Sequence, residues 1–456
     1  MSAVLVSVVA FVVAIGLLVA VHEFGHFWVA RRLGFRVLRF SIGFGRALWS
    51  RRAGPDDIEY VLAAIPLGGY VKLLDEREGP VPEAEADRAF ARRPVLHRIA
   101  VLVAGPAANF VFAIVAFWAL FMYGVPGLRP VIGTVTADSP AARAGLVADD
   151  TLVSVAGRPV PTREAAVITI LDAMLDEGGI PIVVARPDGG RRHVSLAVPE
   201  ERRLQLTEPG ELLRGLGFSF WMPPMPVVVG RLEPDGPAAR AGLAVDDRIV
   251  AIDGVAIGDF TEFLHQVRAR PGAALRLGVV RGETRREVVV VARSDEEDGR
   301  RIGRIGITPR GEARFPDEML TEERFGPLAA VAPAVRETWE KSVLTIRFLV
   351  RMITGDVSVK NISGPINIAQ YAGVTATEGP GYFLGFLALI SISLGVLNLL
   401  PVPVLDGGQI LYQLAELLKG RPLSDEVQLL GQKLGIAVLV ALMGLAFYND
   451  LSRLFG

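Results

Sequence analysis

Long uncharged runs of apolar residues alternate along this chain with a polar middle, and they predict helices that cross a membrane. Ala3–Val21 has 19 residues, Ile99–Tyr123 has 25 and Tyr382–Leu400 has 19. A fourth run, Leu434–Tyr448, has only 15 unless its helix extends back through 427–432. Because about 20 helical residues cross ~30 Å of hydrocarbon, the first three runs predict spans. The fourth allows a span or an interfacial or buried helix.

The first apolar run fits a retained span better than a cleaved signal peptide. A signal peptide has a basic start and small residues at its cleavage site, whereas the first basic residue here is Arg31. Basic residues gather in the loop between the first two runs: Arg31, Arg32, Arg36, Arg39, Arg92, Arg93 and Arg98. Since Lys and Arg favour the cytoplasmic side, this loop is predicted inside. The N-terminus, residues 124–380 and the C-terminus are then outside.

The polar middle contains an internal repeat. Residues 133–160 align without a gap with residues 230–257, at an offset of 97, and 13 of the 28 positions are identical. Each copy is followed by a predicted helix and two predicted strands: Arg163–Asp176, Ile180–Ala185 and Val194–Val198 in the first, Phe260–Ala269, Leu275–Val280 and Glu287–Val291 in the second. The repeat therefore predicts two similar α+β modules.

Both copies resemble PDZ domains of the type found with bacterial proteases. The resemblance rests on Pro140–Leu146 with Asp150–Leu152, and on Pro237–Leu243 with Asp247–Ile249. It implies capture of peptides or chain ends by addition of a strand. Equally open is a role as spacers with unused grooves, because neither copy contains a readable carboxylate-binding loop.

Composition narrows the chemistry. The chain has no cysteine, five histidines and a net charge of −1, and it is 51% hydrophobic. A disulfide framework, a thiolate zinc cluster and a cysteine nucleophile are therefore excluded, and the balanced charge argues against a nucleic-acid binder. Any zinc site must use nitrogen and oxygen ligands.

Two of the five histidines belong to the motif His22-Glu23-Phe24-Gly25-His26 at the end of the first run. On a helix, positions i and i+4 share a face, so His22 and His26 can bind one metal ion. Glu23 can then act as general base on metal-bound water. The alternative is a helix end with interfacial histidines, but ionisable groups within a membrane run are costly and usually functional.

A catalytic zinc site wants a third protein ligand, and Asp406 is the best candidate. It follows Asn398-Leu-Leu-Pro401-Val-Pro403, where proline ends the third span. The predicted topology brings Asp406 and the two histidines to the same cytoplasmic depth. A plain Asp-Gly turn remains the alternative.

These motifs together resemble the site-2 protease family of intramembrane zinc metalloproteases, in its regulator-of-sigma-E protease branch. The resemblance covers nearly the whole chain and includes segments 41–46, 65–72, 104–109 and 360–366. It implies Zn²⁺ held by His22, His26 and Asp406, with Glu23 catalytic. It further implies a membrane-re-entrant β segment in the first loop, whose edge pairs with an unwound substrate.

The resemblance also implies residues that handle the substrate. Asn398 is expected to hold the substrate or to orient Asp406. Residues Arg336–Met352 form a predicted amphipathic helix, either a linker packed on the second module or an interfacial helix. A substrate-gating role is implied for this helix and for Asn361 and Pro365.

The expected fold is a multi-pass α-helical membrane protein with four transmembrane helices, a membrane-associated β segment and two α+β PDZ domains. Its expected divisions are 1–30, transmembrane helix 1 with the histidine motif; 31–94, cytoplasmic loop with the β segment; 95–124, helix 2; 125–226 and 227–325, PDZ domains; 326–379, amphipathic helix and linker; 380–426, helix 3 and cytoplasmic loop; and 427–456, helix 4.

The expected function is cleavage of transmembrane segments of single-span proteins, such as a pre-trimmed anti-sigma factor or remnant signal peptides, in regulated intramembrane proteolysis. The expected place is the bacterial inner membrane, with periplasmic PDZ domains, an active site near the cytoplasmic side and the lipid bilayer as partner. No nucleic-acid partner is expected. The alternatives are a non-catalytic membrane PDZ scaffold and, more weakly, a transporter.

Overall fold

The computed structural model describes residues 3–77, 79–176, 179–297, 300–310 and 315–455. Four of its helices are long and apolar enough to cross a membrane: α1 (Ala3–Arg32), α2 (Val95–Tyr123), α11 (Pro380–Asn398) and α13 (Asp425–Phe455). All four apolar runs are therefore helical, as predicted. The fourth run, of 15 residues, lies within α13, a helix of 31 residues that continues through polar residues at both ends and begins two residues before the predicted division 427–456.

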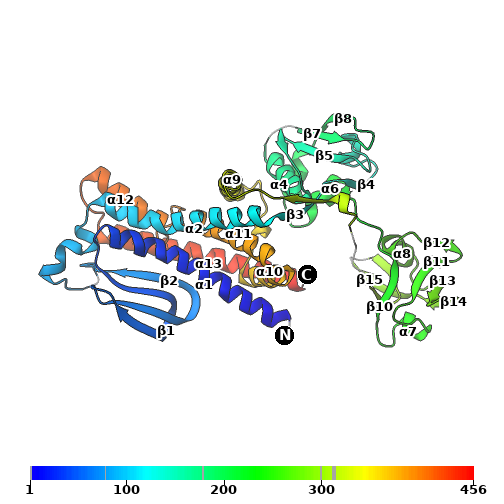
Figure 1. Ribbon diagram of the computed structural model, residues 1–456, viewed down its shortest axis with the longest axis horizontal. Helices are drawn as coiled ribbons and strands as arrows, with labels where there is room; N and C mark the ends of the chain where they lie inside the picture. Colours follow the sequence, from blue (N-terminus) through cyan, green and yellow to red (C-terminus); the bar gives the residue numbers. More distant parts are fainter. Residues whose placement is uncertain (1–2, 78, 177–178, 298–299, 311–314, 456) are drawn as a thin grey trace.

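The long helices form one elongated part of the molecule, and two smaller α+β modules lie beyond one of its ends (Figure 1). Helices α1, α2 and α11 pack against one another. Both chain termini lie at the end of the bundle nearer the modules. This arrangement agrees with the predicted topology, in which the termini and the polar middle share one side of the membrane.

The first loop folds into a curled β sheet beside α1, made by β1 (Val37–Ala53) and β2 (Ile58–Leu73). Residues 37–42 pair with 69–73 on one side and with 59–62 on the other. Residues 47–53 pair with 58–63, so the order across the sheet is 69–73, 37–42, 58–63 and 47–53. Segment 69–73 is thus an edge of the sheet among the pairings of the described residues. Leu48, Trp49 and Leu62 are exposed on the sheet, as expected for a segment in contact with lipid. Two short 3₁₀ turns, Glu83–Arg88 and Phe90–Arg92, lead from the sheet to α2.

The repeated middle forms two modules of the same kind. The elements of the first are β4 (Ile132–Val135), α3 (Pro140–Arg143), β5 (Thr151–Val155), β6 (Arg158–Pro159), α4 (Arg163–Met174), β7 (Ile180–Ala185), β8 (Arg191–Leu196), α5 (Glu200–Leu206), α6 (Glu211–Leu216) and β9 (Phe218–Phe220). Those of the second are β10 (Val227–Leu232), α7 (Pro237–Arg240), β11 (Arg248–Ile252), β12 (Val255–Ala256), α8 (Phe260–Arg268), β13 (Ala274–Arg281), β14 (Thr284–Val291), β15 (Arg293–Glu297), β16 (Arg300–Arg304) and β17 (Ile307–Pro309). The predicted helix and strands of each copy are present, with boundaries shifted by a few residues.

The repeated sequence produces the same local structure twice. Asp150 accepts a hydrogen bond from the backbone N–H of Val147, and Asp247 accepts one from Ala244. Both carboxylates are fully buried. Because a buried acceptor needs a donor, the Asp-Asp turn of each copy fixes the start of the next strand.

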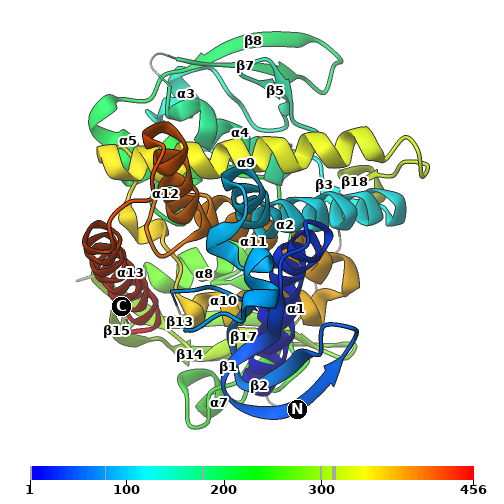
Figure 2. The same ribbon diagram turned by 90° about the vertical axis from the view of Figure 1, so that its left-hand side faces the viewer.

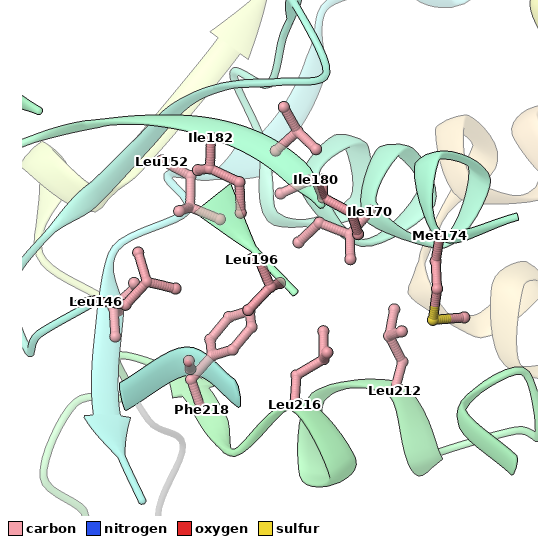
Figure 3. Close-up of a cluster of buried hydrophobic side chains, with 14 of the residues drawn as sticks. Leu146, Leu152, Ile170, Met174, Ile180, Ile182, Leu196, Leu212, Leu216 and Phe218 are labelled. Carbon is pink, nitrogen blue, oxygen red and sulfur yellow. The ribbon is translucent and has the colours of Figure 1, made fainter. Parts of the chain in front are cut away.

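Each module closes with a short strand that the sequence pattern did not reveal. Strand β9 pairs with β4 after the turn at Gly217, and β17 pairs with β10 after the turn at Gly306. In the first module, Leu212 and Leu216 of α6 point into the core beneath α4 and β7 (Figure 3). The closing segments are therefore part of each module's core and not linkers.

The remaining elements connect the modules to the bundle. Strand β3 (Val125–Leu128) leaves α2 and pairs with β18 (Leu320–Glu323), which follows a 3₁₀ turn at Asp317–Met319. Helix α9 (Val331–Thr354) runs across the direction of the long helices (Figures 1 and 2). It is longer than the predicted 336–352 and exposes large apolar side chains, including Trp339 and Ile353. A 3₁₀ turn (Val359–Asn361) and α10 (Pro365–Glu378) precede α11, and α12 (Asp406–Lys419) follows it.

Candidate metal centre

Helix α1 presents both motif histidines on one face. The Nε2 atoms of His22 and His26 lie 3.2 Å apart. Their rings meet edge to face, with centroids 4.8 Å apart. Glu23 follows His22 directly and is half-buried. The one-turn spacing of the motif is thus converted by the helix into two converging nitrogen donors.

Asp406 brings an oxygen donor to the same point from a segment far along the chain. The break at Pro401 and Pro403 ends α11 and lets α12 begin at Asp406. Its Oδ2 lies 3.2 Å from Nε2 of His22 and 3.4 Å from Nε2 of His26. The three side chains that the sequence proposed as ligands therefore meet.

Two glycines let this break fold tightly onto the start of α12. A Cβ added at Gly407 would overlap the carbonyl oxygen of Leu399, and one at Gly408 would overlap that of Val402. Any larger residue would push the loop away from α12. The Gly-Gly pair after Asp406 therefore sets the position of the carboxylate.

The three donor atoms fit a tetrahedral zinc ion. In such a site with bonds of about 2.0–2.1 Å, neighbouring ligand atoms are separated by about 3.3 Å. The three observed separations are 3.2, 3.2 and 3.4 Å. Oδ2 of Asp406 is buried and has no well-formed hydrogen bond among the described residues, so it is free to bind a cation.

Helix α2 packs unusually close to this cluster because it has small residues at the crossing. A Cβ added at Gly105 would overlap Nε2 of His26 and approach Cε1 of His22 to 2.8 Å. On the facing helix, a Cβ at Gly25 would overlap the carbonyl of Ala104. Gly105 therefore lets the backbone of α2 contact the imidazole rings of α1, and Gly25 lets the backbone of α1 contact that of α2.

The same helix supplies polar contacts behind the histidines. Nδ1 of His26 lies 2.7 Å from the carbonyl oxygen of Val101. The amide of Asn109 lies 3.2 Å from Nδ1 of His22. Segment 104–109 of the resemblance includes Asn109, but no motif in the sequence predicts a role for Asn109 or Val101. The available signal was a polar Asn inside an otherwise apolar span.

A buried ion pair ties α12 to the N-terminal end of α2. Arg98 donates to both carboxylate oxygens of Glu416 at 2.6 and 3.0 Å. The side chains are only 8% and 17% exposed. Such bidentate geometry holds the helix that begins with Asp406 in register with α2.

The sheet of the first loop reaches the same site from the side. A Cβ added at Gly69 would come within 2.9 Å of Cγ of Glu23 and 2.7 Å of the carbonyl oxygen of Ser41. Phe27 of α1 stacks edge to face on Phe40 and Tyr60 and so anchors the sheet on the helix. The edge segment 69–73 therefore begins beside Glu23.

The other three predicted site residues lie outside the donor cluster. Asn398 is the last residue of α11. Asn361 donates to the carbonyl oxygens of Thr207 and Ser358, each at 2.9 Å, and so joins the linker to the first module. Pro365 is the first residue of α10. Neither Asn361 nor Pro365 is among the residues that converge on the donor atoms.

Comparisons with known proteins identify the family of this chain. The sequence profile of Peptidase family M50 matches residues 10–442. The chain is 44% identical over 447 residues to the regulator of sigma-E protease RseP of Escherichia coli strain K12, covering 98% of each chain. It is 39% identical over 461 residues to a Vibrio cholerae protein whose name describes a zinc metalloprotease, covering 100% of each. Among solved structures, the PDZ domain of an SdrC-like protein from Listeria monocytogenes matches at 26% identity and a TM-score of 0.17, covering 18% of this chain and 85% of that one.

Proposed function

Because this chain belongs to peptidase family M50 and is an intramembrane zinc metalloprotease, we propose that it cuts a peptide bond in the membrane-spanning segment of a single-span protein, with His22, His26 and Asp406 holding zinc. The observation that carries the residue assignment is the convergence of these three donors, at 3.2–3.4 Å, among helices apolar enough to span a membrane. Family membership favours the enzyme over the non-catalytic scaffold.

Each site residue has a separate task. Bound zinc would supply a Lewis acid, which makes water more acidic and a carbonyl carbon more electrophilic. Glu23 would accept the proton of the attacking water at its carboxylate and return it to the nitrogen of the leaving amine. Asn398 would hold the extended substrate beside Asp406. The half-buried position of Glu23 beside the donors supports its role.

The edge of the loop sheet is the proposed binding place of the unwound substrate. A peptide bond within a helix is shielded by its own hydrogen-bond ladder, so the substrate must become extended before hydrolysis. Segment 69–73 is the outermost segment on one side of the described sheet and passes Glu23 at Gly69. Strand addition there would deliver a scissile bond to the general base.

The proposed placement is the bacterial inner membrane, with residues 31–94 cytoplasmic and PDZ domains over 125–226 and 227–325 in the periplasm. We propose the other domain boundaries as the sequence predicts them, except that the last transmembrane helix begins at residue 425. The relative in Escherichia coli is named for regulation of sigma-E. By that likeness we propose that the substrate resembles an anti-sigma factor. Its periplasmic part would already have been shortened, and the two PDZ domains would exclude substrates whose periplasmic part is still large.

The linker before α11 is the proposed gate for substrate entry. Helix α9 lies across the bundle with Trp339 and Ile353 exposed, as an interfacial helix does. Asn361 and Pro365 occupy the connection that turns from this helix toward α11. Their proposed role is therefore in admitting the substrate and not in the chemistry.

The second PDZ domain is the better candidate for binding a ligand. A cavity of 620 Å³ lies between α8 and the closing segment 302–308, and Phe260, Phe263 and Leu264 line it. A chain end adding beside β17 would place its apolar side chain there. In the first domain, Leu212 and Leu216 of α6 fill the space beneath α4.

The test compares two variants of the full-length chain in lipid nanodiscs. Glu23→Gln is expected to retain one zinc per chain and to lose cleavage of a single-span substrate. Asp406→Ala is expected to lose both. Full activity of Glu23→Gln would reject the general base, and normal zinc content of Asp406→Ala would reject the third ligand.

A further inference from the structure

A buried asparagine on α2 faces one of the metal-binding imidazoles. Asn109 is 0% exposed. Nδ2 of its carboxamide lies 3.2 Å from Nδ1 of His22, and Oδ1 has no hydrogen-bond partner among the described residues. Burying an amide among apolar helices is costly unless the group makes a needed contact. The contact with His22 therefore compensates part of this cost.

The chemistry of a metal-binding histidine decides the direction of this hydrogen bond. A neutral imidazole carries one proton, and a nitrogen that binds metal must keep its lone pair free. The Nε2 atom of His22 faces His26 and Asp406, so its proton belongs on Nδ1. An Nδ1–H group needs an acceptor, whereas Nδ2 of Asn109 can only donate.

A half-turn of the carboxamide resolves this conflict. The rotation exchanges Oδ1 and Nδ2 with almost no change of shape. One polar group of the amide lacks a described partner in either orientation, so satisfaction of the amide alone does not choose between them. The requirement for free Nε2 on His22 does choose, and it places Oδ1 against Nδ1–H.

The neighbouring histidine is held in the same way by the same helix. Nδ1 of His26 lies 2.7 Å from the carbonyl oxygen of Val101. Val101, Gly105 and Asn109 are spaced by four residues and form one stripe on α2, with acceptors at its ends and the close approach of Gly105 between them. Pro106 has no N–H for the carbonyl of Leu102, which opens the hydrogen-bond ladder next to Val101.

We propose that Asn109 is a positioning residue of the zinc site, whose Oδ1 accepts the Nδ1–H of His22 and thereby fixes the ring orientation and tautomer that leave Nε2 free. The inference rests on the proposed zinc site. Partners of this kind usually change metal affinity by about 10- to 100-fold when removed. Ser391 of α11 donates to the backbone carbonyl oxygen of Asn109 and not to its carboxamide.

The test measures zinc affinity in the full-length chain by competition with a chelator. Asn109→Asp keeps an acceptor and removes the donor, whereas Asn109→Leu removes both at similar size. We expect Asn109→Asp to bind zinc within about threefold of wild type and Asn109→Leu to bind about 10- to 100-fold more weakly. Ser391→Ala, which leaves the side-chain contact with His22 in place, is the matched control and should bind normally.

Two further measurements keep the outcome decisive. Thermal unfolding of zinc-free protein shows whether Asn109→Leu folds, and the visible spectrum of the Co²⁺-loaded chain reports the ligand field directly. A change in that spectrum for Asn109→Leu but not for Asn109→Asp supports the proposal. Equal zinc affinity of wild type and Asn109→Leu, or equal weakening by Asn109→Asp, overturns it. Absence of zinc from wild type would instead reject the proposed metal site.

Discussion

The close approach of α2 to the histidines makes one methyl group a strong perturbation. In Gly105→Ala, the new Cβ would stand 2.6 Å from Cε1 of His26 and 2.8 Å from Cε1 of His22, where ordinary contact begins at 3.4 Å. Since the new Cβ would overlap Nε2 of the same ring even more closely, the His26 ring must retreat by at least about 0.8 Å, because packed interiors offer little empty space. Both rings are held from behind by α2 itself, which limits other ways of relaxing.

That displacement is large compared with what a zinc site tolerates. Metal–ligand distances in a functional site lie within about 0.2 Å of their ideal values. A movement of about 0.8 Å would remove His26 as a ligand, and we expect zinc affinity to fall by at least about 100-fold. Helix propensity acts in the opposite direction, since alanine favours a helix over glycine by about 1 kcal/mol. Loss of zinc would thus report the contact and not a weakened helix.

The assay is chelator competition on the full-length chain, with cleavage of a single-span substrate as the second readout. Gly16→Ala is the matched control, because a Cβ at Gly16 on α1 meets nothing within 4 Å. We expect the control to keep both zinc and activity. Wild-type zinc affinity in Gly105→Ala would refute the close packing of α2 on the histidines.

Three other perturbations separate metal binding, packing and module stability. Gly69→Ala should keep zinc but lose cleavage, because the added Cβ would collide with Glu23, the proposed general base, at the edge of the sheet. Normal turnover of this variant would exclude that edge from the reaction. Arg98→Met should lower the free energy of unfolding by about 3 kcal/mol, because Glu416 would stay buried without its charge partner. The double variant with Glu416→Leu should recover part of that stability in a denaturant titration. A free energy of unfolding unchanged by Arg98→Met would show that the pair does not hold α12. Hydrogen bonds from Arg281, at 2.6 and 2.7 Å, hold the pKa of Asp247 below its ordinary 3.8. The stabilisation by this ion pair is therefore present above pH 3.8 and is lost as the pH falls toward the lower pKa of folded Asp247. The thermal unfolding temperature of Asp247→Asn should depend less on pH in that range than that of wild type. An equal pH dependence of the two proteins would contradict this role of Asp247.

The parts of this protein that sequence predicted well depend on short-range physics. An uncharged run of about 20 residues must satisfy its backbone internally in lipid, and a helix does so without help from the rest of the chain. All four predicted runs are helical for that reason. Boundaries were less accurate. Helix α13 is about twice as long as its apolar run of 15 residues, because polar residues continue a helix once it has left the apolar region.

Part of the candidate site was also local. His22 and His26 meet because they are one turn apart on α1, and a helix converts that spacing into a shared face. Asp406 is far away in sequence, yet the membrane topology predicted from the charges put it at the same depth. What topology could not supply was the distance of 3.2–3.4 Å that turns a shared depth into a ligand set.

The tertiary structure alone decided how α2 contributes. Apart from Asn109, the span is apolar on every side, and a single polar residue is too weak a pattern to fix the rotation of α2 about its axis. Packing against α1 sets that rotation and turns Val101, Gly105 and Asn109 toward the histidines. Likewise, the edge segment 69–73 meets Glu23 only because the loop sheet folds back on α1. The sequence by itself thus determined the helices, the repeat and the reactive motif, whereas contacts between distant segments determined the environment in which the motif acts.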